Sequence, residues 1–136
     1  MVSPPAPTPP AAVRAIRGAT TVEADEACAV SAATRELLAA IVERNDVHPD
    51  DLISAVFTVT GDLTSAFPAL AAREMGWTDV PLLCALEIPV AGALARCVRV
   101  LLHVTSARPR AAIDHVYLRR AVALRPDLAA RPADDA

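Results

Sequence analysis

Lysine is absent from this chain: all 13 of its basic residues are arginine. Without an amine, the chain has neither the nucleophile that forms Schiff bases nor the lysine with which a P-loop holds nucleotide phosphates. Arginine does not deprotonate near neutral pH, and it binds carboxylates through two parallel hydrogen bonds. We therefore expect any arginine in a functional site to bind anions or stabilise negative charge, not to transfer protons.

Cysteine is also scarce. Cys28, Cys84 and Cys97 are an odd number without a CxxC pair, so neither a disulfide framework nor a zinc site is indicated. The three histidines also lack the spacing of metal ligands; they are His48, His103 and His115. The sequence predicts no metal and no cofactor, and its cysteine usage favours a reducing compartment.

Long apolar runs and basic stripes are missing too. No run approaches the roughly 18 residues of a membrane helix, and the N-terminus lacks the basic region and apolar block of a signal peptide. Aromatic residues make up 3 % of the chain, and 13 basic against 16 acidic residues give a formal net charge of −3. We expect a cytoplasmic protein with neither a membrane nor a nucleic acid as partner.

The chain does have enough apolar material for one core. It has 136 residues, of which 54 % are hydrophobic, and alanine is its most frequent residue, which indicates closely packed small side chains. Five prolines fall in the first ten positions, so residues 1–12 are predicted to form a disordered tail. A single domain is expected over residues 13–128, followed by a flexible C-terminal tail over 129–136.

Hydrophobic periodicity and turn signals divide this domain into alternating elements. Helical spacing predicts one long helix over 25–45 and a short one over 67–75. Apolar alternation and β-branched residues predict strands over 52–60, 80–88, 96–106 and 116–118. Residues 13–21 are predicted to start as a strand and to end in a turn, because glycine and threonines close the segment. The fold class is therefore α/β, a mixed five-stranded sheet with a single substantial helix.

Two strands have unusual patterns. In the strand predicted over 96–106, alternation places side chains on two faces. One face has Val98, Val100, Leu102 and Val104, and the other has Cys97, Arg99, Leu101 and His103. Arg99 thus lies in an otherwise apolar strand, which is costly unless the charge is paired. The run 80–88 is nearly continuously apolar and is predicted to be covered on both faces. Because one helix cannot cover both faces of the sheet, we expect a homo-oligomer of closed cyclic symmetry.

Five segments together resemble one known family. They are Ile16-Arg17-Gly18-Ala19-Thr20-Thr21-Val22, Cys84-Ala85-Leu86-Glu87, Cys97-Val98-Arg99-Val100, His115-Val116-Tyr117-Leu118 and Leu124-Arg125-Pro126-Asp127-Leu128. In order and spacing they resemble the monofunctional chorismate mutases of the α/β trimeric type, over residues 13–128. The resemblance implies a homotrimer with a pseudo-α/β-barrel core and active sites between subunits. It also implies the cofactor-free Claisen rearrangement of chorismate to prephenate, in phenylalanine and tyrosine biosynthesis.

The resemblance assigns a role to each matching position. It places Arg99 at the ether oxygen of the substrate, Arg17 at a carboxylate and Glu87 at the ring hydroxyl. It places Cys84 near the same hydroxyl and Tyr117 on a carboxylate, and the shared cleft would take Arg17 and Tyr117 from separate chains. Further residues are expected to line the pocket: Phe67, Ala69, Arg73, Leu83, Ala85, Leu86, Leu124 and Arg125. Two positions depart from the family pattern, because Leu70 stands where lysine is usual and Leu83 where threonine is.

Other interpretations of these residues stay open at this level. Arg99 could be a structural ion-paired residue, Arg17 an exposed strand end and Glu87 a solvated strand terminus. Cys84 and Tyr117 could simply belong to the core. Strict alternation puts Cys84 and Glu87 on opposite faces, so both can reach one ligand only if the strand ends or bulges between them. For the whole protein, the alternatives are a non-catalytic trimeric sensor of a dicarboxylate and a purely structural oligomerisation module.

Overall fold

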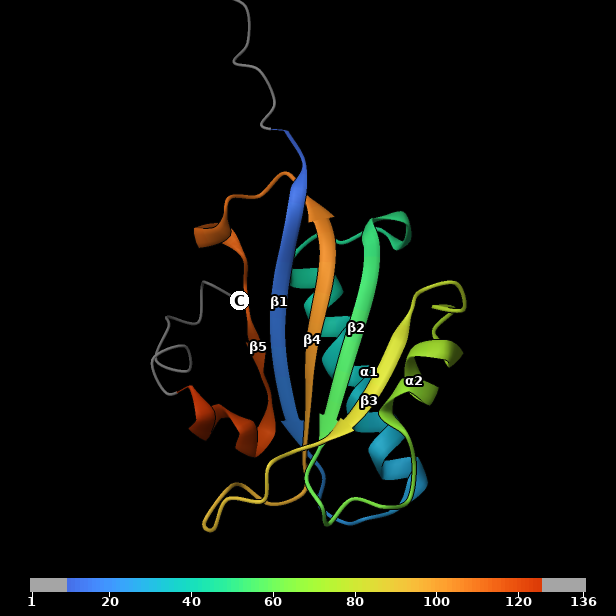
Figure 1. Cartoon of the computed structure of the whole chain (residues 1–136), viewed down its shortest axis with the longest axis vertical. Coiled ribbons are helices and arrows are strands. Elements are labelled where there is room, and N and C mark those ends of the chain that lie inside the picture. Colours follow the sequence, from blue (N-terminus) through green and yellow to red (C-terminus); the bar gives the residue numbers. More distant parts are fainter. Residues whose placement is uncertain (1–9, 126–136) are drawn as a thin grey trace, which may run out of the picture.

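A computed structural model describes residues 10–125. Five strands form one mixed sheet in the order β3-β2-β4-β1-β5 (Figure 1). The strands are β1 (Ala12–Thr21), β2 (Leu52–Val59), β3 (Leu82–Leu86), β4 (Cys97–Ser106) and β5 (Val116–Tyr117). The central strands β1, β4 and β2 are antiparallel, whereas β5 runs parallel to β1 and β3 runs parallel to β2. The predicted mixed five-stranded sheet is confirmed.

In the described range 10–125, two α-helices and three short 3-10 helices accompany the sheet. They are α1 (Ala27–Arg44), η1 (Pro49–Asp51), α2 (Pro68–Glu74), η2 (Arg110–Ala112) and η3 (Arg119–Leu124). The predicted helices 25–45 and 67–75 correspond to α1 and α2, while η3 was not predicted. The turn predicted at the end of 13–21 is wrong, because Gly18 to Thr21 continue β1 by pairing with β4. The tail expected over 1–12 falls outside the described residues up to residue 9, and β1 already begins at Ala12. The tail expected over 129–136 also lies outside them.

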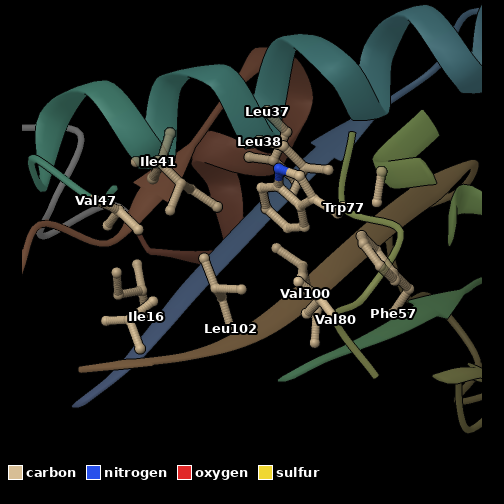
Figure 2. Packing of buried hydrophobic residues seen from close by; sticks show 14 of the residues in the cluster. Ile16, Leu37, Leu38, Ile41, Val47, Phe57, Trp77, Val80, Val100 and Leu102 are labelled. Carbon is tan, nitrogen blue, oxygen red and sulfur yellow. The ribbon is translucent and has the colours of Figure 1, made fainter. Parts of the chain in front are cut away.

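The core lies between α1 and the sheet. Val30, Leu37, Leu38 and Ile41 are buried along one side of α1, at the helical spacing that a sheet-facing stripe requires. The predicted alternation of β4 is confirmed at its helix-facing positions; Val98, Val100, Leu102 and Val104 are all buried. Figure 2 shows Ile16, Leu102 and Val100 beneath this helix, with Trp77 next to Leu37 and Leu38 and with Phe57 at the end of the cluster.

Gly18 lets β1 approach α1 closely. A Cβ atom at this position would lie 2.7 Å from Cδ1 of Ile41 and 3.1 Å from Cδ1 of Leu37. Both neighbours are fully buried, so neither has free space into which to move. The glycine beside Arg17 therefore sets how deeply the site-bearing part of β1 sits against the helix.

Within residues 10–125 no helix covers the other face of the sheet, and β3 is an edge strand. In Figure 1, α1 lies behind the sheet and α2 beside β3. Within the single chain, residues 80–88 are not covered on both faces, because Leu83 is 63 % and Leu86 67 % exposed, so the predicted cover has to come from another subunit. Leu83 lies opposite Val56 on the face that bears the cleft side chains, and within residues 10–125 no helix packs over that face. None of the helices within residues 10–125 is long and apolar enough to cross a bilayer.

Candidate active site

Four of the five predicted catalytic residues meet in one cleft on the open face of the sheet. This arginine cleft, of about 370 Å³, is lined by Arg17, Gly18, Val56, Thr58, Glu87, Arg99, Val100, Leu101 and Tyr117. Its charged groups come from β1, from the residue following β3 and from β4. Two guanidinium groups against one carboxylate give the cleft an excess of positive charge, which suits an anionic ligand.

Arg99 is paired with Glu87. Its Nε lies 2.7 Å from Oε1 of Glu87, and the two side chains are 46 % and 25 % exposed. This oxygen is buried and accepts no well-aligned hydrogen bond from the described part of the chain, so its contact with Arg99 is an ion pair, and a ligand donor would have to use the other carboxylate oxygen. The pair explains how an apolar strand tolerates an arginine. Register places Arg99 opposite Thr58 of β2 and Ala19 of β1, at the centre of the sheet.

Arg17 and Tyr117 are neighbours within one chain. Nη2 of Arg17 donates a hydrogen bond of 3.0 Å to Oη of Tyr117. The expectation that they come from separate chains is therefore wrong, because parallel pairing of β5 with β1 places Tyr117 opposite Ala19, two residues from Arg17. A phenol that accepts from arginine still has its own proton to donate to a bound carboxylate.

A network outside the cleft fixes where β4 begins. The carboxylate of Asp62 accepts the backbone N–H of Arg96 at 2.9 Å, and Oγ1 of Thr60 accepts the N–H of Cys97, also at 2.9 Å. Arg96 has a φ of 47°, an unusual angle for a residue with a side chain, and its Nε donates to the carbonyl of Val22. Hydrogen bonding from Thr60, then from the Arg96 amide, lowers the pKa of Asp62. The start of β4, two residues before Arg99, is thus held from β1 and from the end of β2.

Cys84 does not reach the arginine cleft. It lies opposite Phe57, whose side chain is buried on the helix side of the sheet, and it packs against the same core. β3 ends at Leu86, and the N–H of the next residue, Glu87, donates a hydrogen bond to the carbonyl of Val59. The strand alternation therefore continues to Glu87 and places its side chain on the opposite face from that of Cys84. Cys84 instead lines a second hollow of about 330 Å³, the β3–α2 cavity, with Val59, residues 63–68, Ala85 and Leu86. Among the predicted pocket residues, Phe67, Ala85 and Leu86 lie here.

The remaining predicted pocket residues line neither hollow in the single chain. Ala69 is 5 % exposed and belongs to the hydrophobic core, because it is on the inner side of α2. Arg73 is exposed in the last turn of α2, and Leu83 is exposed on the open face of β3. Leu124 packs against a small cluster that includes Tyr117, and Arg125 follows it directly. Leu70, one of the two departures from the family pattern, is 44 % exposed.

Sequence reasoning missed several lining groups. Val56, Thr58 and Leu101 face the arginine cleft because they alternate with core residues on β2 and β4, a signal that was present in the strand patterns. His115, set aside as having no metal-ligand spacing, accepts the backbone N–H of Arg17 at Nδ1 over 2.9 Å. Within residues 10–125, no three His, Cys, Asp or Glu side chains group as metal ligands would.

Comparisons with known proteins show which proteins this chain is similar to. The family described as chorismate mutase type I matches residues 13–128. The chain is 54 % identical over 117 residues to "Chorismate mutase AroH" of Thermus thermophilus, covering 85 % of this chain and 96 % of that protein. It is 44 % identical over 117 residues to "Chorismate mutase AroH" of Bacillus subtilis (strain 168), covering 85 % and 92 %. A solved structure, "Chorismate mutase from Clostridium thermocellum Cth-682", superposes with a TM-score of 0.79 at 50 % identity, covering 80 % of this chain and 97 % of that one.

Proposed function

Because the chain belongs to the chorismate mutase type I family, we propose that it rearranges chorismate to prephenate in the arginine cleft, as a homotrimer whose subunits share each site. The observation that carries this proposal is the convergence of Arg17, Glu87, Arg99 and Tyr117 in one cleft. The residues come from four separate segments of the chain, and the excess positive charge matches a substrate with two carboxylates. The isomerase produces the precursor of phenylalanine and tyrosine.

The reaction asks little of the protein in covalent terms. One carbon–oxygen bond of the ether bridge breaks while a carbon–carbon bond forms within the same molecule, and no proton is transferred. The protein must hold the substrate in a compact shape and stabilise the charge that develops as the ether bond lengthens. Arginines suit the second task, because their charge does not depend on pH near neutrality.

Arg99 is the residue proposed to stabilise the ether oxygen. Its guanidinium is already placed by the 2.7 Å contact with Glu87, so little reorganisation is needed when negative charge appears nearby. Glu87 serves twice in this scheme: it orients Arg99, and it has capacity to accept the ring hydroxyl of the substrate. The interaction of Arg99 with the oxygen strengthens as the bond breaks, which is the requirement for raising kcat.

Arg17 and Tyr117 are proposed to bind a carboxylate of the substrate. Their mutual hydrogen bond of 3.0 Å presents a cation and a neutral donor side by side. A carboxylate is charged both in the ground state and in the transition state, so this pair binds both about equally. Its contribution belongs to substrate affinity more than to the rate of the chemical step.

The trimer is supported by what one subunit leaves uncovered. Phe67, Leu83 and Leu86 are 74 %, 63 % and 67 % exposed, an apolar surface along α2 and β3 that a second subunit would bury. We propose that the β3–α2 cavity of one subunit, with Phe67 and Cys84, closes over the arginine cleft of the next. Arg73, near this edge, is the residue that we expect to compensate for the missing lysine at Leu70.

We place the enzyme in the cytoplasm. All three cysteines are free thiols, and Cys97 is buried, so the fold uses no disulfide. Such usage is typical of a reducing compartment.

The test is the loss of chorismate absorbance on addition of the purified protein, with prephenate identified as the product. Turnover supports the enzyme. Tight carboxylate binding without turnover would instead support the sensor, which no comparison favours. Light scattering measures the mass of the assembly, and a monomer with full activity at assay concentrations would contradict the shared site.

A further inference from the structure

The edge of β1 at Arg17 has an unusual hydrogen-bond partner. β5 pairs with β1 over two residues only, Gly18 with Val116 and Ala19 with Tyr117. The N–H of Arg17 lies just beyond this short ladder, and it donates to Nδ1 of His115 at 2.9 Å. The imidazole therefore takes the place that a backbone carbonyl would hold if β5 were longer.

β5 and the residue before it hold Arg17 through both its backbone and its side chain. His115 binds the backbone of Arg17, while Tyr117, two residues further along the strand, binds its guanidinium at 3.0 Å. Because Nδ1 accepts a hydrogen bond, the neutral imidazole carries its proton on Nε2. A doubly protonated ring has no acceptor and cannot make this contact.

His115 is itself anchored by a buried asparagine. Asn45, 3 % exposed at the end of α1, donates from Nδ2 to the carbonyl of Asp114 and accepts the Asp114 N–H at Oδ1, both at 2.8 Å. Nδ2 also donates to the carbonyl of Ile41 at 3.0 Å. Asp114, the residue before His115, is thus fixed to the end of α1, so the imidazole has a defined position along β1.

We propose that neutral His115 is a positioning residue for Arg17: its Nδ1 holds the backbone of Arg17 so that the guanidinium points into the arginine cleft, and protonation of the ring releases it. This inference rests on the proposed carboxylate-binding role of Arg17. It predicts that chorismate affinity, not the rate of the chemical step, depends on the protonation of a histidine that never touches the substrate.

The charges around His115 set the direction of the effect. The charges of Arg17 in β1, Arg125 after η3 and the preceding Asp114 act on the imidazole of His115. His115 also lines a hollow together with Arg14 of β1, His103 of β4 and Arg110 of η2. Burial, then the charges of Arg17 and Arg125, lowers the pKa of His115, with Asp114 opposing. The ring is therefore neutral at pH 7, and protonation takes place at pH values below the ordinary histidine range near 6.5. Acidification removes the acceptor and adds a positive charge beside Arg17.

The experiment measures kcat and KM for chorismate from about pH 5 to pH 8 in the parent and three variants. His115→Asn keeps an acceptor oxygen near the position of Nδ1 but cannot titrate, so its KM should stay close to the parent value at pH 7.5 and remain flat on acidification. His115→Leu should raise KM roughly tenfold at every pH, with kcat within a few-fold of the parent. His48→Gln, at an exposed histidine in the connection after α1, is the matched control and should reproduce the parent profile.

Amide hydrogen exchange at Arg17 supplies a readout that does not need turnover. The amide should be protected in the parent and in His115→Asn and should exchange faster in His115→Leu. An unchanged KM in a folded His115→Leu protein, or a rise of KM at acid pH in His115→Asn equal to that of the parent, would overturn the inference. If the leucine variant fails to fold, the pH profile of the asparagine variant decides alone. A parent without chorismate turnover would refute the proposed function, while the exchange rates would still test the contact.

Discussion

Replacing Arg99 with alanine should lower turnover far more than substrate binding. The change removes the guanidinium proposed to meet the ether oxygen, and it leaves the carboxylate of Glu87, now 2.7 Å from its partner, without that counterion. The charged groups lining the cleft then become one arginine and one glutamate. The cleft loses its net positive charge at the moment when negative charge develops in the substrate.

The size of the loss follows from the kind of interaction removed. One well-aimed donor to a developing oxyanion is worth about 2.7–4 kcal/mol, or roughly 10²–10³ in rate. A full positive charge should exceed this if a neighbouring subunit closes the cleft as proposed, so kcat should fall by about 10³ or more. Arg99→Lys should recover only part, because an ammonium keeps the charge but not the reach or the donor geometry of a guanidinium.

The assay is the decrease of chorismate absorbance at a series of substrate concentrations, which separates kcat from KM. Arg44→Ala is the matched control, because Arg44 accepts a hydrogen bond through its backbone carbonyl at the end of α1, outside the cleft. Circular dichroism and light scattering establish that each variant is folded and assembled. A folded, assembled Arg99→Ala protein with kcat within a few-fold of the parent would refute the electrostatic mechanism.

Three further outcomes are expected from single substitutions. Arg17→Ala should raise KM at least tenfold with a smaller change in kcat, since the carboxylate that Arg17 binds is charged throughout the reaction. A fall in kcat as large as the rise in KM would instead show a role in the chemical step. Gly18→Ala should destabilise the fold by about 1–3 kcal/mol in urea unfolding, because its Cβ would meet Ile41 at 2.7 Å, and an unchanged midpoint would contradict that packing. Asp62→Ala should lower the melting temperature at pH 7, and the difference from the parent should vanish as pH falls: a carboxyl with a lowered folded pKa stabilises above its unfolded pKa, near 3.8, and ceases to do so on protonation. A difference that persisted at pH 2 would show that the effect is not due to the carboxylate.

The elements with strong local patterns could be predicted from the sequence. The alternation along β4 identified both its buried face and the odd position of Arg99, and the periodicity of α1 identified the helix that covers that face. These features depend on residues that are close together in the sequence, so local sequence patterns predict them. Local patterns do not predict the open face of the sheet or the edge position of β3, because both depend on which strands pair.

The identities of the site residues were easier to predict than which of them lie together in one cleft. Tyr117 meets Arg17 in one chain because a two-residue strand pairs with β1 across about a hundred residues of sequence, a contact that no local pattern reports. Cys84 and Glu87 are three residues apart, yet they line different hollows, since alternation and the end of β3 separate them. The role of His115 was missed for the same reason: its partner is a backbone N–H on a distant strand.

Mixing two inactive variants tests the shared chorismate site most directly. Arg99→Ala damages the arginine cleft, and Phe67→Glu places a carboxylate at an exposed position of the β3–α2 cavity, where it repels a dianion. In trimers re-formed from an equal mixture, a site is intact when its cleft comes from the Phe67→Glu chain and its cavity from the Arg99→Ala chain, which holds for about a quarter of the sites. The account predicts that about this fraction of parental chorismate turnover returns. A mixture of Arg99→Ala with Arg17→Ala should show no turnover beyond the average of the two unmixed variants, because both residues line the cleft of one chain. No recovery in the first mixture once subunits have exchanged, or equal recovery in both, would contradict a site built from two subunits.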